Sequence, residues 1–190
     1  MRRVVITGVG AVTPIGNTVK EMWAGVREGK CGIDKITKYD ISNRKVKVAA
    51  EVKNLPVEEL VDKHDLRKMD LFCAFAMIAA DEAIADSGLS FEGEEDKCGV
   101  IVSSGIGGIS TIEKEYSKGL EKGFDRVSPY FIPSVITNMA AGRIAIKHNL
   151  QGMCSCVVTA CAGGTNAVGD SFRQIRDGYA DVMVCGGAEA

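Results

Sequence analysis

The 190-residue sequence has no large excess of charge of either sign. It contains 23 lysines and arginines against 25 aspartates and glutamates, which gives a formal net charge of -2. A protein that neutralises the phosphates of nucleic acid needs a basic surface, and this balance gives no sign of one. Long apolar runs are also missing, since a membrane-spanning helix needs about 20 consecutive apolar residues. We therefore expect neither nucleic acid nor a membrane as a partner.

The sequence also lacks the cysteine spacing of a zinc ribbon. Its seven cysteines are an odd number in a chain long enough to bury a core, which argues against a disulfide framework and favours a reducing compartment. Cys154 and Cys156 lie two residues apart, but nothing nearby supplies the remaining ligands of a metal site. The apolar run that begins at Val4 is soon broken by glycines and by Pro14, so no signal peptide is predicted. We expect a cytoplasmic protein without a metal site.

Apolar runs and segments of helical periodicity alternate along the chain. The patterns predict strands at 4–7, 46–52, 98–103, 157–159 and 182–185, and helices at 19–27, 66–87, 109–122, 134–147 and 162–177. Continuous apolar runs such as 98–103 are typical of strands that are buried on both faces of a parallel sheet. The sequence therefore predicts an α/β layered architecture.

Cys161 lies where one of these strands meets the next helix. Most free cysteines are simply small buried hydrophobic residues, so its surroundings have to decide its role. The N–H groups at the start of a helix have no partner within it, so they favour a thiolate and can donate to an oxyanion. Its neighbours Ala160, Ala162, Gly163 and Gly164 are small, which leaves room for an exposed sulfur at a sharp turn. We predict that Cys161 is a nucleophile.

The segment Thr159-Ala160-Cys161-Ala162-Gly163-Gly164-Thr165 closely resembles the nucleophile motif of the β-ketoacyl-acyl carrier protein synthases, the condensing enzymes of fatty acid synthesis. The resemblance runs through the whole chain and is greatest to the bacterial elongating synthase II type. Further segments match the family in the same order: 4–16, Arg67-Lys68-Met69-Asp70, 105–108, 128–134 and 181–189.

This resemblance implies a thiolase-like layered fold, an α/β fold of two similar halves, of which residues 1–190 would be the first, N-terminal half only. It places the helix 162–177 between two sheets of a five-layered sandwich. The family's two catalytic histidines, its active-site lysine and a phenylalanine-glycine loop belong to the second half. The only histidines here, His64 and His148, both precede Cys161 and match neither catalytic position. The domain 1–190 is therefore expected to be incomplete.

The resemblance also implies a reaction. The cysteine accepts an acyl group from the phosphopantetheine arm of acyl carrier protein, and malonyl-acyl carrier protein loses carbon dioxide to give an enolate that attacks the thioester. The implied partners are acyl carrier protein and fatty acyl and malonyl thioesters, with no cofactor besides the carrier's phosphopantetheine. The complete enzyme is expected to be a homodimer. The alternative is a non-catalytic remnant or fragment of such a synthase.

Further site residues are implied by position in the family motifs. Ile106 matches the gatekeeper at the base of the acyl pocket, and Phe131 matches an aromatic residue that lines it near the dimer interface. Arg67 and Lys68 match the pair near which acidic acyl carrier protein docks, and Lys63 is four residues before Arg67 on the same face; all three are expected at the start of a helix.

Two other classes of enzyme are weaker alternatives. A dinucleotide-binding G-x-G-x-x-G loop is incomplete after both strands that could carry one, because Thr13 and Ser110 replace the third glycine. A cysteine hydrolase with a nucleophile elbow needs a histidine after the nucleophile, and none follows Cys161.

Overall fold

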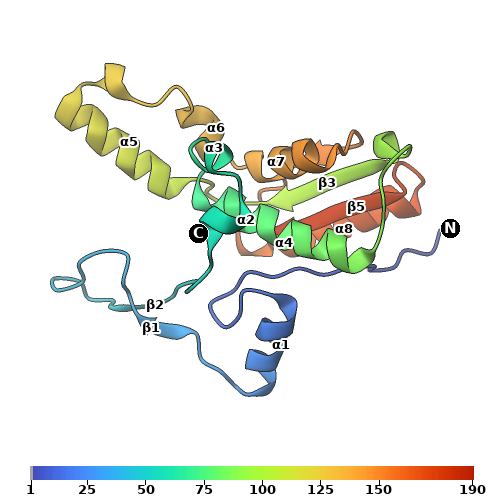
Figure 1. The fold of residues 1–190 in the computed structure, drawn as a ribbon, viewed down its shortest axis with the longest axis horizontal. Coiled ribbons are helices and arrows are strands. Elements are labelled where there is room, and N and C mark those ends of the chain that lie inside the picture. The colour runs from blue at the N-terminus through green and yellow to red at the C-terminus, as the bar shows by residue number, and fades with distance from the viewer. Residues whose placement is uncertain (1) are drawn as a thin grey trace.

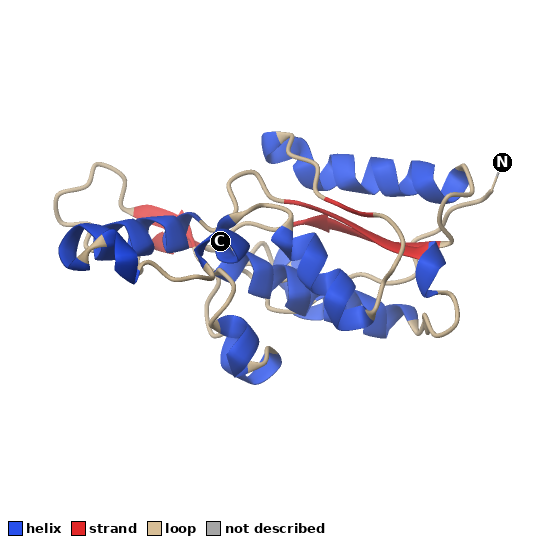
Figure 2. Ribbon diagram, turned by 90° about the horizontal axis from the view of Figure 1, so that it is seen from above, coloured by secondary structure: helices blue, strands red, loops and turns tan. Residues whose placement is uncertain are grey.

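A computed structural model describes residues 2–190 and shows a small parallel sheet with helices on both faces (Figure 1). The sheet has the strand order β4-β3-β5, formed by β4 (Cys154–Ser155), β3 (Cys98–Ser103) and β5 (Val182–Gly187). Two helices, α4 (Leu71–Ser87) and α7 (Met139–His148), pack together on one face, while α8 (Gly163–Arg176) covers the other (Figure 2). The structure confirms the α/β layered architecture.

The remaining elements lie outside these layers. The chain begins with an extended segment and then forms α1 (Val19–Arg27), the antiparallel pair β1 (Ile33–Lys35) and β2 (Val48–Ala50), and the short helices α2 (Val57–Leu60) and α3 (Lys63–Leu66). The helix α5 (Ile109–Lys122) projects away from the sheet and is followed by α6 (Phe131–Val135) (Figure 1). Three short 3-10 helices lie at Glu95–Lys97, Phe124–Arg126 and Ala160–Ala162.

The hydrophobic core lies between the sheet and the α4–α7 face. Every residue of β3 is buried, as the continuous apolar run predicted, and Val100 is 0% exposed. Phe72 of α4 and Ile144 of α7 close the core from the helical side, with exposed fractions of 0% and 1%. The apolar run at 182–185 also predicts a buried strand, and this prediction was wrong, because the residues of β5 are half-buried or exposed.

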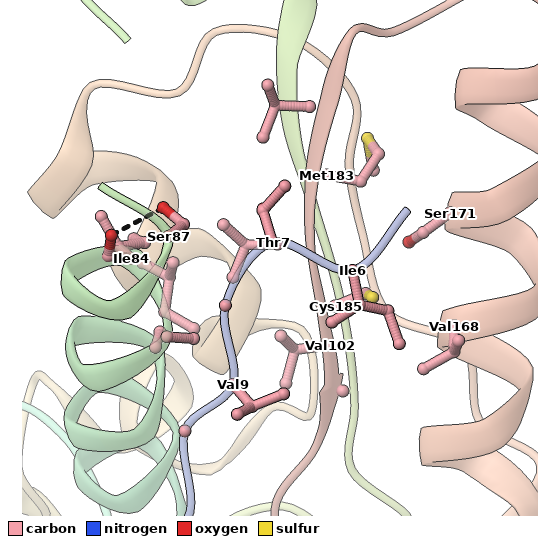
Figure 3. A pocket seen from close by; sticks show the side chains of 18 of the residues that line it. Ile6, Thr7, Val9, Ile84, Ser87, Val102, Val168, Ser171, Met183 and Cys185 are labelled. Carbon is pink, nitrogen blue, oxygen red and sulfur yellow. Dashed lines mark hydrogen bonds between the residues drawn. The ribbon is translucent and has the colours of Figure 1, made fainter. Parts of the chain in front are cut away.

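The predicted strand at 4–7 was also wrong, because residues 4–10 are extended but form no ladder with the sheet. Beyond residue 7 the segment is attached to α4 instead: the amide of Val9 donates to Asp86 at 3.0 Å and that of Ala11 to Glu82 at 2.9 Å. A side chain at Gly10 would overlap the carbonyl oxygen of Ala79, so this close approach requires glycine. A cavity of about 540 Å³ lies among residues 4–10, α4, α8 and β5 (Figure 3).

Two long predicted helices are each divided in the structure. The predicted helix at 66–87 is interrupted after α3, because Asp70 turns to accept hydrogen bonds from the amide and hydroxyl of Thr111 at the start of α5. The predicted helix at 134–147 is interrupted between α6 and α7, where the carbonyl of Val135 accepts from the amide of Gly108 at 3.0 Å. Both interruptions come from contacts with distant segments, which helical periodicity does not report.

Two predicted strands are shorter than expected. The ladder of β2 covers Val48–Ala50 within the expected 46–52. The strand β4 ends at Ser155, so 157–159 lies outside the sheet, and the side chain of Val158 is 56% exposed. The chain has therefore left the sheet before it reaches Cys161.

Two isoleucines of α7 provide a matched test of this core. Ile144 is 1% exposed and Ile146 is 76% exposed on the same helix. We expect Ile144→Ala to lower the free energy of unfolding by about 2–5 kcal/mol, because it removes buried methyl groups and leaves a cavity. Ile146→Ala should change it by less than about 0.5 kcal/mol. Urea unfolding of both variants measures the difference, and equal losses would contradict the proposed packing.

Candidate active site

The carboxyl ends of the three parallel strands meet at one edge of the sheet, and a loop follows each strand there. The loop 104–108 follows β3, the turn that carries Cys161 follows β4, and Glu189 follows β5. The amide of Ala188 donates to the carbonyl of Ser103 at 2.9 Å, so the pairing continues just past the end of both strands. In parallel α/β sheets this edge is where ligands commonly bind.

Cys161 occupies a tight turn immediately before α8. It is exposed and lies within the 3-10 helix Ala160–Ala162. Ala160 has a φ of +49°, a left-handed conformation that is uncommon for a residue with a side chain. Backbone conformations of this kind are costly and are frequent at functional sites. The turn thus holds the sulfur outside the sheet, as the small neighbours predicted.

Glycines allow α8 to begin directly on the ends of the strands. A side chain at Gly163 would overlap the hydroxyl of Ser103, and one at Gly164 would lie 3.5 Å from the amide nitrogen of Gly187. The cap residue Ala162 has no polar side chain that could accept from the first turn of the helix. The amide of Gly163 donates to the Ala160 carbonyl, and the N–H groups that follow it in the first turn of α8 have no side-chain cap and can serve an anion.

Four other cysteines are in surroundings that disfavour a thiolate. Burial raises the pKa of the Cys73 thiol to about 12. Burial also raises the pKa values of Cys98, Cys154 and Cys185. Cys185 has exposed atoms, but its thiol faces the apolar cavity beside β5 (Figure 3). A raised thiol pKa means less thiolate near neutral pH, so these four cysteines should be poor nucleophiles.

The two expected acyl-pocket residues lie on segments that pack against each other. Ile106, at the tip of the loop 104–108, is 59% exposed. Gly107 has a φ of +73°, and a side chain there would overlap the carbonyl oxygen of Val135 in α6. Phe131 is the first residue of α6 and is half-buried. The structure thus brings the two segments together.

The three expected docking cations lie around α3 rather than at the start of a long helix. Lys63 begins α3 and Arg67 is its C-cap, while Lys68 follows in the turn before α4. The expectation that Arg67 and Lys68 lie at a helix N-terminus was therefore wrong. The ammonium group of Lys68 lies 5.2 Å from the centre of the Tyr130 ring, and Arg143 donates to the Lys68 carbonyl at 2.8 Å. These contacts place Lys68 next to α6.

The sequence interpretation missed Glu189. Its carboxylate accepts hydrogen bonds from the Ser104 hydroxyl, at 3.3 Å, and from the Gly105 amide. Within the sequence it was only the last residue of a family motif. An acidic residue directly after a Gly-Gly strand end is the one local signal that could have pointed to it.

Neither histidine supplies a base to Cys161 by the hydrogen bonds that the structure shows. His148 Nε2 lies 2.8 Å from the carboxylate of Asp81, and His64 lies against Lys68. Within residues 2–190 no three His, Cys, Asp or Glu side chains form a group that could hold a metal ion. In the same part of the chain, no helix combines the length and apolarity that crossing a membrane requires.

Comparisons with known proteins agree along the whole chain. The model of a family described as "Beta-ketoacyl synthase, N-terminal domain" matches residues 1–190. The chain is 45% identical over 190 residues to 3-oxoacyl-(acyl-carrier-protein) synthase 2 of Synechocystis sp. and to that of Staphylococcus aureus, covering 100% of this chain and 46% of each relative. It thus spans about half the length of the curated relatives it matches.

A solved structure shows the same relation in three dimensions. The ishigamide ketosynthase/chain length factor superimposes with a TM-score of 0.88 at 30% sequence identity. The superposition covers 100% of this chain and 48% of that chain. The thiolase-like fold expected from the sequence motifs is therefore present, as about half of such a chain.

The contrast between Cys161 and Cys185 can be measured directly. With limiting iodoacetamide near neutral pH, Cys161 should alkylate faster than Cys185 by about tenfold or more, because Cys161 is exposed at a helix start whereas desolvation raises the pKa of the Cys185 thiol. Peptide mapping at early times gives the ratio, and Cys73 serves as the slow internal control. Equal labelling of Cys161 and Cys185 would contradict an activated thiol.

Proposed function

Because residues 1–190 match the model of the β-ketoacyl synthase N-terminal domain, the chain belongs to that family, and we propose that Cys161 accepts an acyl group in a β-ketoacyl-acyl carrier protein synthase. The observation that supports this most is the position of Cys161, exposed at a left-handed turn before the uncapped start of α8. The names of the relatives, which are 45% identical, give the substrate class.

The first step is transfer of the acyl group. The thiolate of Cys161 attacks the carbonyl carbon of an acyl thioester on acyl carrier protein and forms a tetrahedral oxyanion. The N–H groups that follow Gly163 in the first turn of α8 have no side-chain cap and would donate to that oxyanion. The carbon–sulfur bond to the carrier then breaks, and the departing thiolate takes up a proton. Covalent capture divides one difficult condensation into two easier steps.

The second step is condensation with malonyl-acyl carrier protein. Loss of carbon dioxide leaves an enolate, whose carbon attacks the Cys161 thioester and lengthens the chain by two carbons while the cysteine sulfur leaves. The enolate oxygen needs neutral donors, and His64 and His148 have other partners. We propose that a second half of the synthase supplies these donors and that residues 1–190 alone do not elongate or decarboxylate.

The proposed carrier-docking site is the cationic surface around α3. Lys63 and Arg67 are exposed, and Lys68 bridges this surface to Tyr130 beside the acyl-pocket segment. An acidic carrier protein would be attracted to this surface, which raises the rate of association more than the final affinity.

We also propose a cytoplasmic location and a homodimeric complete enzyme. The exposed stripe Ile109, Ile112, Tyr116 and Leu120 along α5 supports a further protein contact.

A non-catalytic role is the second candidate function. It is favoured by the contacts of the two histidines, because His64 lies against Lys68 and His148 against Asp81 and neither offers Cys161 a base. In that case Cys161 would have no acyl-transfer role, and the experiments below separate the two.

A chimaera tests the proposed function within a complete synthase. Residues 1–190 would replace the matching half of the Staphylococcus aureus relative, which is 45% identical. We expect the chimaera to form 3-oxoacyl product and Cys161→Ala to reduce this by at least about a thousandfold, because the acyl acceptor is lost. Cys185→Ala is the matched control and should keep most of the activity. Undiminished condensation in the Cys161→Ala chimaera would contradict the proposal.

The chain alone should give no turnover. Supplied with acyl- and malonyl-acyl carrier protein, residues 1–190 should release no carbon dioxide and form no 3-oxoacyl product, because donors for the enolate are lacking. Both products are followed by mass spectrometry, with the chimaera as the positive control. Turnover that disappears in Cys161→Ala would show that other groups in this chain catalyse the condensation.

The docking surface can be tested by charge reversal. Arg67→Glu combined with Lys68→Glu, made in the chimaera, should slow association with acyl carrier protein by about tenfold or more at low salt. The matched control reverses another adjacent and exposed pair, Arg44→Glu with Lys45→Glu. Stopped-flow binding gives both rates. Equal association rates for the two double variants would contradict this assignment.

A further inference from the structure

A single carboxylate connects the ends of β3 and β5 at the candidate site. One oxygen of Glu189 accepts from the amide of Gly105, and the other accepts from the Ser104 hydroxyl at 3.3 Å. The Ser104 hydroxyl in turn accepts from the amide of Gly107 at 3.0 Å. The carboxylate therefore determines, directly or through one hydroxyl, the hydrogen bonding of residues on both sides of Ile106.

The loop 104–108 is anchored at both of its ends. Its far end is attached to α6, where the amide of Gly108 donates to Val135 at 3.0 Å. Its near end is held through Ser104, which is 1% exposed and contacts Glu189. Gly107 has a φ of +73°, so the loop reverses sharply between these two anchors. Ile106 lies between them with 59% of its surface exposed, so its position follows from the anchors.

Gly105, which donates to this carboxylate, also lies near the nucleophile turn. A Cβ atom built on Gly105 would be 3.1 Å from a carboxylate oxygen of Glu189 and 3.9 Å from the Cα atom of Ala160. Gly105 precedes Ile106 and Ala160 precedes Cys161. The loop residue Gly105 thus lies between the Glu189 carboxylate and the turn that carries the sulfur.

We propose that Glu189 is a positioning residue that fixes the loop 104–108 and so sets where Ile106 stands relative to an acyl group on Cys161. A carboxylate suits this role because it accepts at both oxygens and faces two donors, the Gly105 amide and the Ser104 hydroxyl. A glutamine would replace one acceptor with an NH₂ donor. The consequence for acyl-chain selection rests on the proposed function. The claim that Glu189 fixes the position of the loop 104–108 does not.

Hydrogen exchange in the full chain tests the hold on the loop. In Glu189→Gln we expect the amides of Gly105 and Gly107 to exchange about tenfold faster, because a hydrogen bond to a charged acceptor is lost. The amides within β3 should be unchanged. Glu121→Gln removes the same charge from an exposed site on α5 and should leave the loop unaffected. Unchanged exchange at both glycines in Glu189→Gln would overturn the proposal.

Labelling of Cys161 tests the effect on chain-length selection. The probes are N-ethylmaleimide and N-dodecylmaleimide, and the readout is the ratio of their rates. Glu189→Gln should change the ratio by about fivefold or more while the short reagent keeps its rate, because a displaced Ile106 affects only the long chain. Ser104→Ala should change it similarly, and the double variant should add little, as expected for residues in one network.

The two measurements separate the proposals. Faster exchange at Gly105 and Gly107 with an unchanged labelling ratio would overturn the link from Glu189 to Ile106. Faster exchange together with a changed labelling ratio would support the link from Glu189 to Ile106. If Cys161 of the unaltered chain reacts no faster than Cys185 with the short reagent, the proposed function fails. The exchange measurement then decides by itself whether Glu189 holds the loop.

Discussion

The parallel pairing of β3 with β5 is the interaction on which the candidate site depends. The two strands are in register from Cys98 opposite Val182 to Ser103 opposite Gly187, and one further hydrogen bond joins Ala188 to Ser103. Because the strands end together, the loop 104–108 and Glu189 emerge side by side. The short strand β4 pairs with the other edge of β3 and delivers the Cys161 turn to the same end of the sheet. Three segments far apart in the sequence therefore reach one small region.

Close backbone contacts bring the start of α8 to the ends of the strands, beside Cys161. Gly163 and Gly164 let the start of α8 approach Ser103 and Gly187, so the N–H groups of the helix begin at the strand ends. The left-handed Ala160 then directs Cys161 outward instead of into the core. A side chain at Gly163 would overlap Ser103 and so move the start of α8 away from the strands and from the sulfur. The glycines that weaken α8 as an isolated helix are thus needed for its position.

The sequence predicted those features whose causes are local. The helices α1 and α5 and the strand β3 begin and end at the expected residues, because periodicity and apolar runs are properties of each segment. Residues 4–7 were misassigned because pairing depends on a distant partner, and here the segment that continues from them is attached to carboxylates of α4 through the amides of Val9 and Ala11. Glu189 was missed for a similar reason, since its partner Ser104 lies 85 residues away in the chain. Cys161 was found because its strand-turn-helix context is contiguous, and its catalytic role is still a proposal.

Acylation of the chain by its proposed substrate tests the central claim most directly. The 190-residue chain is incubated with acyl-acyl carrier protein, and the intact mass and peptide map are recorded over time. We predict one acyl adduct, located on Cys161, which hydroxylamine removes as expected for a thioester and which is absent in Cys161→Ala. An adduct on Cys185 or Cys31 instead, or no adduct on a folded chain that binds the carrier protein, would contradict the assignment of Cys161 as the acyl acceptor.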